Sequence, residues 1–179
     1  MADLFVPVSA ADHITGKTDA HIVLVVYGDY QCPYTGRAYP VFMKLAEQWP
    51  DQLSVVFRNY PLYAVHPQAL MAAATAEFAG KHGKFWPVFN TLFQNQRLLG
   101  DAFFAEVLET EGLSIEGFKA DVDNNSLENK IRQDIEGGNQ SGVHGTPSFF
   151  INGERYQPQN SSKELGPYIE SLLKTKRAT

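Results

Sequence analysis

Gly28-Asp29-Tyr30-Gln31-Cys32-Pro33-Tyr34-Thr35 contains the single cysteine of this 179-residue chain and joins two segments of different periodicity. The preceding segment, residues 22–27, is short, continuously apolar and rich in β-branched side chains. It predicts a strand buried on both faces, as in a largely parallel sheet. The following segment, residues 34–49, carries apolar residues at helical spacing, and Pro33 suits the first helical position because the N–H that it lacks has no partner there. We therefore expect Cys32 at or next to the N-cap of a helix.

This position favours a reactive thiol at Cys32. Unpaired backbone N–H groups and the positive end of the helix dipole stabilise an anion at a helix N-terminus, so the thiolate form should be favoured. Lone cysteines are also common as small buried hydrophobes, and that alternative stays open.

The segments on either side of this stretch predict an α/β fold. Residues 53–60 are rich in β-branched and aromatic side chains and end at Pro61, which predicts a second strand. A strand, a crossover helix and a second strand form a βαβ unit, which should be right-handed with parallel strands. Residues 1–20 contain a short apolar piece at 4–8 and a glycine at Gly16, so we expect a short edge strand and a turn there.

A long helical segment follows the second predicted strand. Apolar residues recur at helical spacing from about residue 66 to 140, with glycines between the runs. Helix starts are indicated by four signals: Pro67, Asp101 as a cap, Ser114 as a cap, and Asn125 with Glu128 as a capping box.

The β pattern returns near the C-terminus. Residues 147–151 and 154–156 are β-type, and Asn152-Gly153 between them is a strong signal for a hairpin. Residues 165–173 predict a terminal amphipathic helix, and Pro167 should restrict how early that helix begins.

Composition excludes several classes of protein. Hydrophobic residues make up 44% of the chain, which supplies a core and argues against disorder. A formal net charge of −5, with no basic tract, argues against binding to nucleic acid or to an anionic membrane surface. The longest apolar run is far shorter than a membrane helix, and no secretory signal is recognisable. We therefore expect a cytoplasmic protein, or a periplasmic or exported one if a leader has been removed.

Four stretches together resemble the DsbA-like thioredoxin-fold family. Residues 29–35 resemble its active-site turn, usually aspartate-phenylalanine-x-cysteine-proline-tyrosine-cysteine. Residues 142–153 (Gly-Val-His-Gly-Thr-Pro-Ser-Phe-Phe-Ile-Asn-Gly) are similar to its cis-proline loop and hairpin. Residues 62–69, with His66-Pro67, and the stretch Lys84-Phe85-Trp86 match its inserted helices. The resemblance covers about residues 12–175.

The resemblance implies a thioredoxin-like α/β fold with an inserted helical domain. Residues 1–179 would form a single DsbA-like domain, with a thioredoxin core at about 12–62 and 142–175 and a helical insertion at about 63–141. Cys32 would be the nucleophile, and Pro147 a cis proline facing it.

The resemblance also implies a substrate groove around these residues. The backbone of Thr146 would bind an extended substrate, and Pro33, Tyr30 and Tyr34 would line the groove, with core packing as the alternative for either tyrosine. His144 is a candidate acid–base group near the thiol or, alternatively, a solvated loop residue.

Two departures from the family pattern concern the same half-reaction, the one in which the second cysteine would form an internal disulfide with Cys32. Thr35 occupies the position of the second cysteine, and Val26 occupies the position where the family often carries a buried acid. Thr35 is either a hydrogen-bond donor to the Cys32 thiolate or a tolerated replacement on an exposed turn. Since a chain with one cysteine cannot form an internal disulfide, a dithiol cycle is excluded.

The leading hypothesis is a monothiol thiol-disulfide oxidoreductase with Cys32 and Thr35 as catalytic residues. Its substrates would be protein or peptide thiols and disulfides, and glutathione would act as co-substrate with no tightly bound cofactor. Oxidation of Cys32 to a sulfenic acid is a related possibility. The alternatives are a glutathione-dependent non-redox transferase or isomerase, and a redox-inactive peptide-binding module. No group of residues shows metal-ligand spacing.

Overall fold

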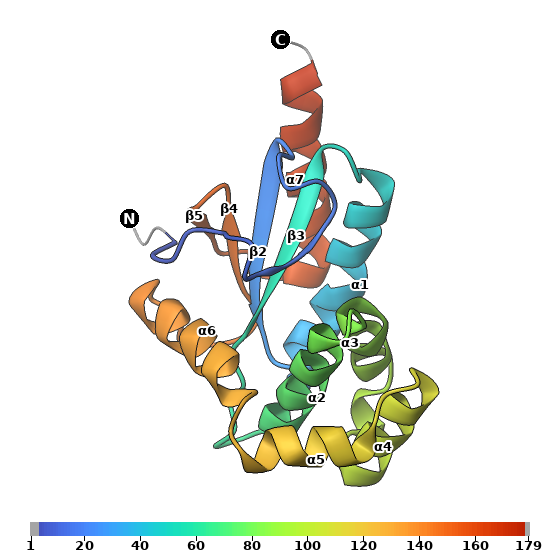
Figure 1. Cartoon of the computed structure of the whole chain (residues 1–179). Coiled ribbons are helices and arrows are strands. Elements are labelled where there is room, and N and C mark those ends of the chain that lie inside the picture. The colour runs from blue at the N-terminus through green and yellow to red at the C-terminus, as the bar shows by residue number, and fades with distance from the viewer. Residues whose placement is uncertain (1–3, 178–179) are drawn as a thin grey trace.

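The computed structural model describes residues 4–177, with side chains described to residue 175, and contains one five-stranded sheet with helices around it (Figure 1). The strands are β1 (His13–Thr15), β2 (Ile22–Gly28), β3 (Leu53–Asn59), β4 (Ser148–Ile151) and β5 (Glu154–Tyr156). The helices are α1 (Pro33–Gln48), α2 (Ala69–Lys81), α3 (Phe85–Gln94), α4 (Asp101–Thr110), α5 (Ile115–Asp123), α6 (Glu128–Gln140) and α7 (Ser161–Arg177), with a 3-10 turn, η1, at Gln96–Leu98.

The sheet has the strand order β1-β3-β2-β4-β5, with β2 at its centre. Strands β2 and β3 are parallel, as the βαβ pattern predicts. The other three pairings are antiparallel, so the expectation of a largely parallel sheet is wrong. A continuously apolar strand is one that is buried on both faces. A central strand of a mixed sheet is buried in this way too, so the pattern does not distinguish a mixed sheet from a parallel one.

Two apolar cores pack against the two faces of the sheet. On one face, alternate residues of β2 and β3, such as Leu24 and Phe57, belong to the large core that includes α1, α7 and the helices between β3 and β4. On the other face, Val25 and Val56 belong to a small core that includes Val143 from the segment after α6. The alternation along each strand delivers side chains to both cores, which explains why β2 and β3 lack a polar face.

The helices α2–α6 gather at the end of the sheet where β2 and β3 finish (Figure 1). They lie between β3 and β4 in the chain, within the segment 63–141 for which an insertion is predicted. The carboxyl end of β2, and with it the turn before α1, therefore lies between the sheet and this helical group.

Several local predictions differ from the structure. The edge strand of the N-terminal segment is β1, whereas residues 4–8 form no strand. Asn125 has a φ of 57° and lies outside α6, whose N-cap is Leu127, so the predicted capping box is wrong. Helix α7 begins at Ser161 and contains Pro167, so the prediction that this proline restricts how early the helix begins is wrong. The predicted cap at Ser114 is confirmed: its side chain accepts the N–H of Gly117.

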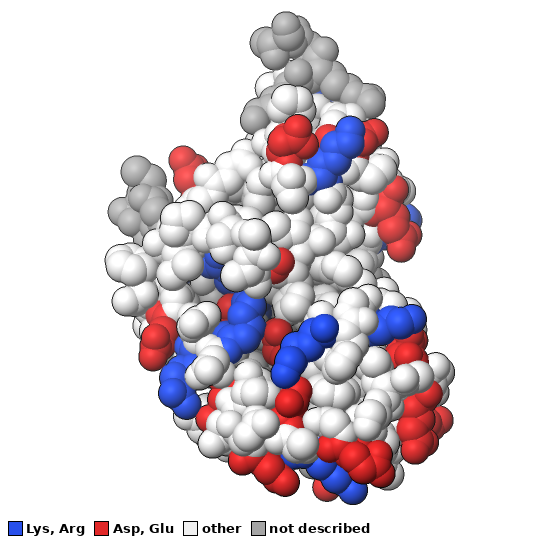
Figure 2. All heavy atoms as spheres, in the orientation of Figure 1, with Lys and Arg blue, Asp and Glu red and all other residues white. Residues whose placement is uncertain are grey.

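Charged side chains of both signs are interspersed on the face shown in Figure 2, with acidic residues frequent over α4 and α5. Among the described residues, no helix combines the length and the apolar character needed to cross a bilayer.

A buried ion pair ties the N-terminal segment to β3. Arg58 donates to the two carboxylate oxygens of Asp12 over distances of 2.9 Å and 2.9 Å, and both side chains are at most 5% exposed. Burial by itself would raise the pKa of Asp12, but hydrogen bonds from Arg58 and the Ser9 N–H, together with the charges of Arg58 and Lys130, hold this pKa below its usual value. The folded state therefore favours the ionised carboxylate.

Asp12→Asn is expected to lower the free energy of unfolding at pH 7 by about 3 kcal/mol, because it leaves the Arg58 charge buried without its counter-ion. Since the pKa of Asp12 is lower in the folded chain, its contribution is fully present above the unfolded pKa near 3.8 and is lost as the pH falls through the folded value. Urea titrations from pH 7 to pH 2.5 should show the difference between the two chains shrinking below about pH 4. Asp51→Asn, which breaks the exposed pair with Lys17, is the control and should leave stability nearly unchanged over the whole pH range, because solvent screens this pair.

Candidate functional site

Cys32 lies where the carboxyl end of β2 turns into α1. It is the N-cap residue of α1, has extended backbone angles, and is followed by Pro33 at the first helical position. Its side chain makes no capping hydrogen bond, so the sulfur is not committed to the helix end. The residue is buried, with 3% of its surface exposed. The predicted N-cap position is thus confirmed.

The loop before β4 meets Cys32 from the other side. The peptide bond between Thr146 and Pro147 is cis. The carbonyl oxygen of Thr146 lies 3.4 Å from the Cys32 Sγ and accepts its S–H. Two segments separated by 114 positions in the sequence thereby form one site. A molecule bound along Thr146 would place its own atoms beside the sulfur.

The Asp29 carboxylate is the polar centre of the turn. It is 1% exposed, and its Oδ1 accepts the backbone N–H groups of Gln31 at 2.7 Å and Cys32 at 3.1 Å. Its Oδ2 accepts the N–H of Leu62 at 2.9 Å and lies 2.7 Å from Nδ1 of His66. A buried carboxylate is stable only when its oxygens are fully hydrogen-bonded. Asp29 therefore fixes the turn that carries Cys32 to the segment after β3.

Two glutamine side chains, one in the turn and one in the helical segment, connect the turn to that segment. Oε1 of Gln31 accepts the N–H of Gln68 just before α2, at 2.7 Å. Nε2 of Gln96 donates to the carbonyl oxygens of Tyr30, at 2.7 Å, and Cys32, at 3.0 Å. Gly36 is needed for this contact, since a Cβ at that position would lie 2.1 Å from Oε1 of Gln96. The backbone around the cysteine is thus fixed by three separate segments.

Thr35 is fully buried, so its interpretation as a replacement on an exposed turn is wrong. Its Oγ1 accepts the N–H of Asp29 at 3.5 Å, and its Cγ2 lies against Gly28. The hydroxyl therefore faces the end of β2. Val26 is likewise fully buried and belongs to the large apolar core.

The structure separates the two tyrosines of the predicted groove. Tyr34 is exposed, and its ring lies 4.5 Å from the Arg37 guanidinium carbon. Tyr30 is 1% exposed and packs among Phe57, Phe89 and Phe93 in the core, so it does not line the groove. Burial, with the nearby charges of Glu77 and Asp134, raises the pKa of Tyr30 well above its usual value.

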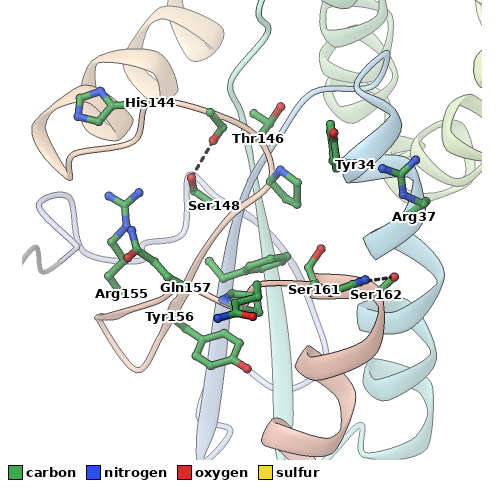
Figure 3. Close-up of a pocket in the computed structure, with 16 residues that line it drawn as sticks. Tyr34, Arg37, His144, Thr146, Ser148, Arg155, Tyr156, Gln157, Ser161 and Ser162 are labelled. Carbon is green, nitrogen blue, oxygen red and sulfur yellow. Dashed lines mark hydrogen bonds between the residues drawn. The ribbon is translucent and has the colours of Figure 1, made fainter.

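A cavity of about 480 Å³ lies beside the cis-proline loop (Figure 3). Tyr34, Thr146 and Pro147 line it, and so does His144, which is exposed and lies at the end of the cavity away from Tyr34. Pro33 is exposed next to the cavity but does not line it. The structure thus brings four of the predicted substrate-binding residues to one cavity, at whose edge Thr146 contacts Cys32.

The sequence indicated no role for Asp29 or Gln96, and it placed His66 only at a helix start before Pro67. Asp29 carried a usable signal, because an aspartate three residues before a helix N-cap often accepts backbone N–H groups of the turn. Gln96 lies 64 positions from Cys32 and has no local signal. Among the described residues, no group of three or more histidine, cysteine or acidic side chains could hold a metal ion.

A family model described as thioredoxin matches residues 9–171. Among solved structures, the chain is similar to oxidised BdbD from Bacillus subtilis, with 20% identity, a TM-score of 0.77, and coverage of 92% of this chain and 94% of that one. It is also similar to the thiol-disulfide exchange protein alpha-DsbA2 from Wolbachia pipientis, with 17% identity, a TM-score of 0.75, and coverage of 91% and 88%. These structures share its DsbA-like thioredoxin fold.

A curated relative carries a different kind of name. The Na⁺/H⁺ antiporter NhaA 1 of Salinispora arenicola is 35% identical over 172 residues, which are 96% of this chain and 26% of the antiporter. The chain thus spans about a quarter of the length of the curated relatives it matches, and the similarity concerns one segment of those proteins.

Proposed function

Because this chain belongs to the thioredoxin family, with a DsbA-like fold, we propose that it is a thiol-disulfide oxidoreductase that works through Cys32 alone. One observation carries the proposal: the Cys32 sulfur lies at a helix N-terminus, 3.4 Å from the carbonyl oxygen that precedes the cis proline. The thiolate of a cysteine is the nucleophile in disulfide exchange, and this sulfur is the only one that the chain can offer as a thiolate.

The reaction begins with attack of the Cys32 thiolate on one sulfur of a substrate disulfide. A new S–S bond forms between Cys32 and that sulfur, the substrate S–S bond breaks, and the other substrate sulfur leaves as a thiolate. The electron pair of the Cys32 sulfur forms the new bond, and the pair of the broken bond stays on the leaving sulfur. Thr146 contacts the attacking sulfur, so a substrate bound along its backbone lies beside that sulfur.

The second step requires a thiol from outside the chain, because position 35 is a threonine. Attack by a glutathione thiolate on the Cys32 sulfur releases the substrate thiolate and leaves glutathione on Cys32. A second glutathione then releases Cys32 as thiolate and forms glutathione disulfide. Two glutathione molecules supply the two electrons for one reduced disulfide. Isomerisation follows instead if the first leaving thiolate attacks another disulfide of the substrate, and the thiolate that this attack frees then attacks the substrate sulfur of the mixed disulfide and releases Cys32 as thiolate.

The identities of Thr35 and Val26 support the monothiol form of the proposal, because they leave the chain without a resolving thiol and without an acid at position 26. A second thiol in the first turn of α1 would occupy the fully buried position of Thr35, next to Gly28. The hydroxyl there accepts the N–H of Asp29 and cannot take part in a disulfide. Thr35 thus fills the position that a resolving cysteine would occupy and hydrogen-bonds within the turn.

Thr35→Cys is expected to convert the site into a dithiol. With oxidised glutathione at pH 7, the native chain should retain one glutathione on Cys32, whereas the variant should expel it and form an internal disulfide, because the new thiol lies one helical turn away. Intact mass under non-reducing conditions distinguishes the two products.

Thr35→Ser is the matched control, since it keeps the hydroxyl and adds no thiol; it should retain glutathione like the native chain. Absence of a glutathione adduct on the folded native chain, with a normal adduct on the unfolded chain, would reject the proposed function. The cavity would then be studied as a peptide-binding surface.

A further inference from the structure

The cavity beside the cis-proline loop is positively charged, although the whole chain has a net charge of −5. Its 16 lining residues include Arg37 and Arg155 and contain no aspartate or glutamate. Figure 3 shows the two arginines on opposite sides, with Gln157, Ser161 and Ser162 between them. An anionic group in this cavity would therefore meet a cation from either side.

Neither arginine is neutralised by a carboxylate among the residues that the structure describes. Arg37 is exposed, and its guanidinium lies over the Tyr34 ring at 4.5 Å. A cation over an aromatic face is held in place while its N–H groups stay available. Arg37 lies on α1, the helix whose N-cap is Cys32.

Arg155 is held more firmly on the other side. Its Nη1 donates to the carbonyl oxygens of Ser141, at 3.5 Å, and of Gly142, just after α6. These contacts orient the guanidinium and leave its other N–H groups for a ligand. Arg155 is half-buried, a setting in which hydrogen bonds to charged groups are stronger than at a fully exposed surface.

The floor of the cavity is polar and is formed in part by the first residues of α7. Ser161 and Ser162, the first two residues of this helix, line it together with Asn160. The positive end of the α7 dipole adds to the two arginines. Glu164, in the first turn, lies outside the lining and accepts the N–H of Gln159 at 3.0 Å. Hydroxyl, amide and guanidinium groups together suit the carboxylates of a peptide.

We propose that this cavity binds carboxylates of the peptide segment that flanks the disulfide exchanged at Cys32, so that the enzyme prefers acidic substrates. This inference rests on the proposed function and adds the substrate class. Arg37 and Arg155 are its specificity residues. Thr146 belongs to both the cavity and the contact with the Cys32 sulfur, so the carboxylates would lie within a few residues of the substrate cysteine.

The test uses two short peptides, each with one cysteine and joined as a symmetric disulfide, that differ only in glutamate or lysine beside the cysteine. The rate constant for formation of the mixed disulfide with Cys32 is followed by intact mass at 50 mM salt and pH 7. The glutamate peptide should react about 10-fold faster, and this preference should fall with rising salt. Glutathione disulfide forms a third arm, because it offers carboxylates without a longer peptide chain.

Arg37→Gln and Arg155→Gln should each lower the rate with the glutamate peptide by about 3-fold to 10-fold and leave the lysine peptide unchanged or faster. Arg132→Gln is the matched control, because Arg132 lies on α6 outside the cavity and pairs with Glu128. It should leave both rates unchanged. An effect of the cavity variants on the longer peptide alone, and not on glutathione disulfide, would assign the preference to protein-derived segments.

A binding measurement separates this inference from the proposed function. The Cys32→Ala chain should bind an S-methylated glutamate peptide more tightly than its lysine counterpart by about 10-fold, as measured by calorimetry. Equal rates and equal binding for the two peptides would overturn the inference while leaving disulfide exchange in place. If no peptide reacts with Cys32 but the acidic peptide still binds, the proposed function fails and the cavity remains an acidic-peptide site.

Discussion

Replacing Cys32 by alanine is expected to abolish disulfide exchange while leaving the fold intact. The chain has one cysteine, so no second thiol can take over the attack on a substrate disulfide. We expect the exchange rate to fall by at least about 1000-fold, to the level of the uncatalysed reaction with glutathione. The assay is reduction of a glutathione–peptide mixed disulfide, coupled to the consumption of glutathione.

The structure explains why this variant should fold. The Cys32 side chain makes no capping bond to α1, and its hydrogen bond to Thr146 is a weak S–H contact at 3.4 Å. Loss of one small buried sulfur should cost about 1 kcal/mol. A melting curve close to that of the native chain is the control for folding. Retained glutathione turnover in the variant would contradict the mechanism and favour a non-redox glutathione-dependent enzyme.

Asp29→Ala is expected to have the largest effect on stability. The carboxylate is 1% exposed and accepts three backbone N–H groups and the contact with His66 Nδ1. Its removal leaves the amides of Gln31, Cys32 and Leu62 without their side-chain acceptor. We expect a loss of about 4–5 kcal/mol in the free energy of unfolding, or roughly 10 °C in melting temperature. Thermal unfolding followed by circular dichroism measures it.

Two further variants make this result specific. Asp29→Asn keeps one oxygen for two of the amides but turns an N–H₂ group toward the other donors, so it should lose about half as much. Asp123→Ala removes an exposed carboxylate from α5 and should change stability by less than about 0.5 kcal/mol. A loss for Asp29→Ala as small as that of the control would show that the turn is held without this carboxylate.

Local patterns along the chain predicted most of the elements around the site. The apolar run before Cys32 is β2, the helix after Pro33 is α1, and Asn152-Gly153 joins β4 to β5 with positive φ angles at both residues. These features follow from periodicity, proline geometry and turn chemistry, each of which acts within a few residues. They also placed Cys32 at the N-cap, which is the basis of its proposed reactivity.

The tertiary structure decided what surrounds the sulfur. The buried position of Tyr30, the contact of Asp29 with Leu62 and the contact of Gln96 with the turn depend on segments that are distant in sequence. The local pattern gave the tyrosines at 30 and 34 similar roles, yet one packs in the core and one lies over the cavity. The packing of α3 against the turn, and not the motif, separates them.

The sequence by itself therefore determined the order of strands and helices, the helix N-terminus at Cys32 and the absence of a resolving cysteine. The family resemblance, and not a local pattern, placed the Thr146-Pro147 loop opposite Cys32. Only the tertiary structure decided the mixed order of the sheet, the burial of Tyr30, and the opposition of Arg37 and Arg155 across one cavity. The reason is physical: backbone propensity and side-chain periodicity are properties of neighbouring residues. A site built from residues more than 100 positions apart depends on how the sheet and the helices pack.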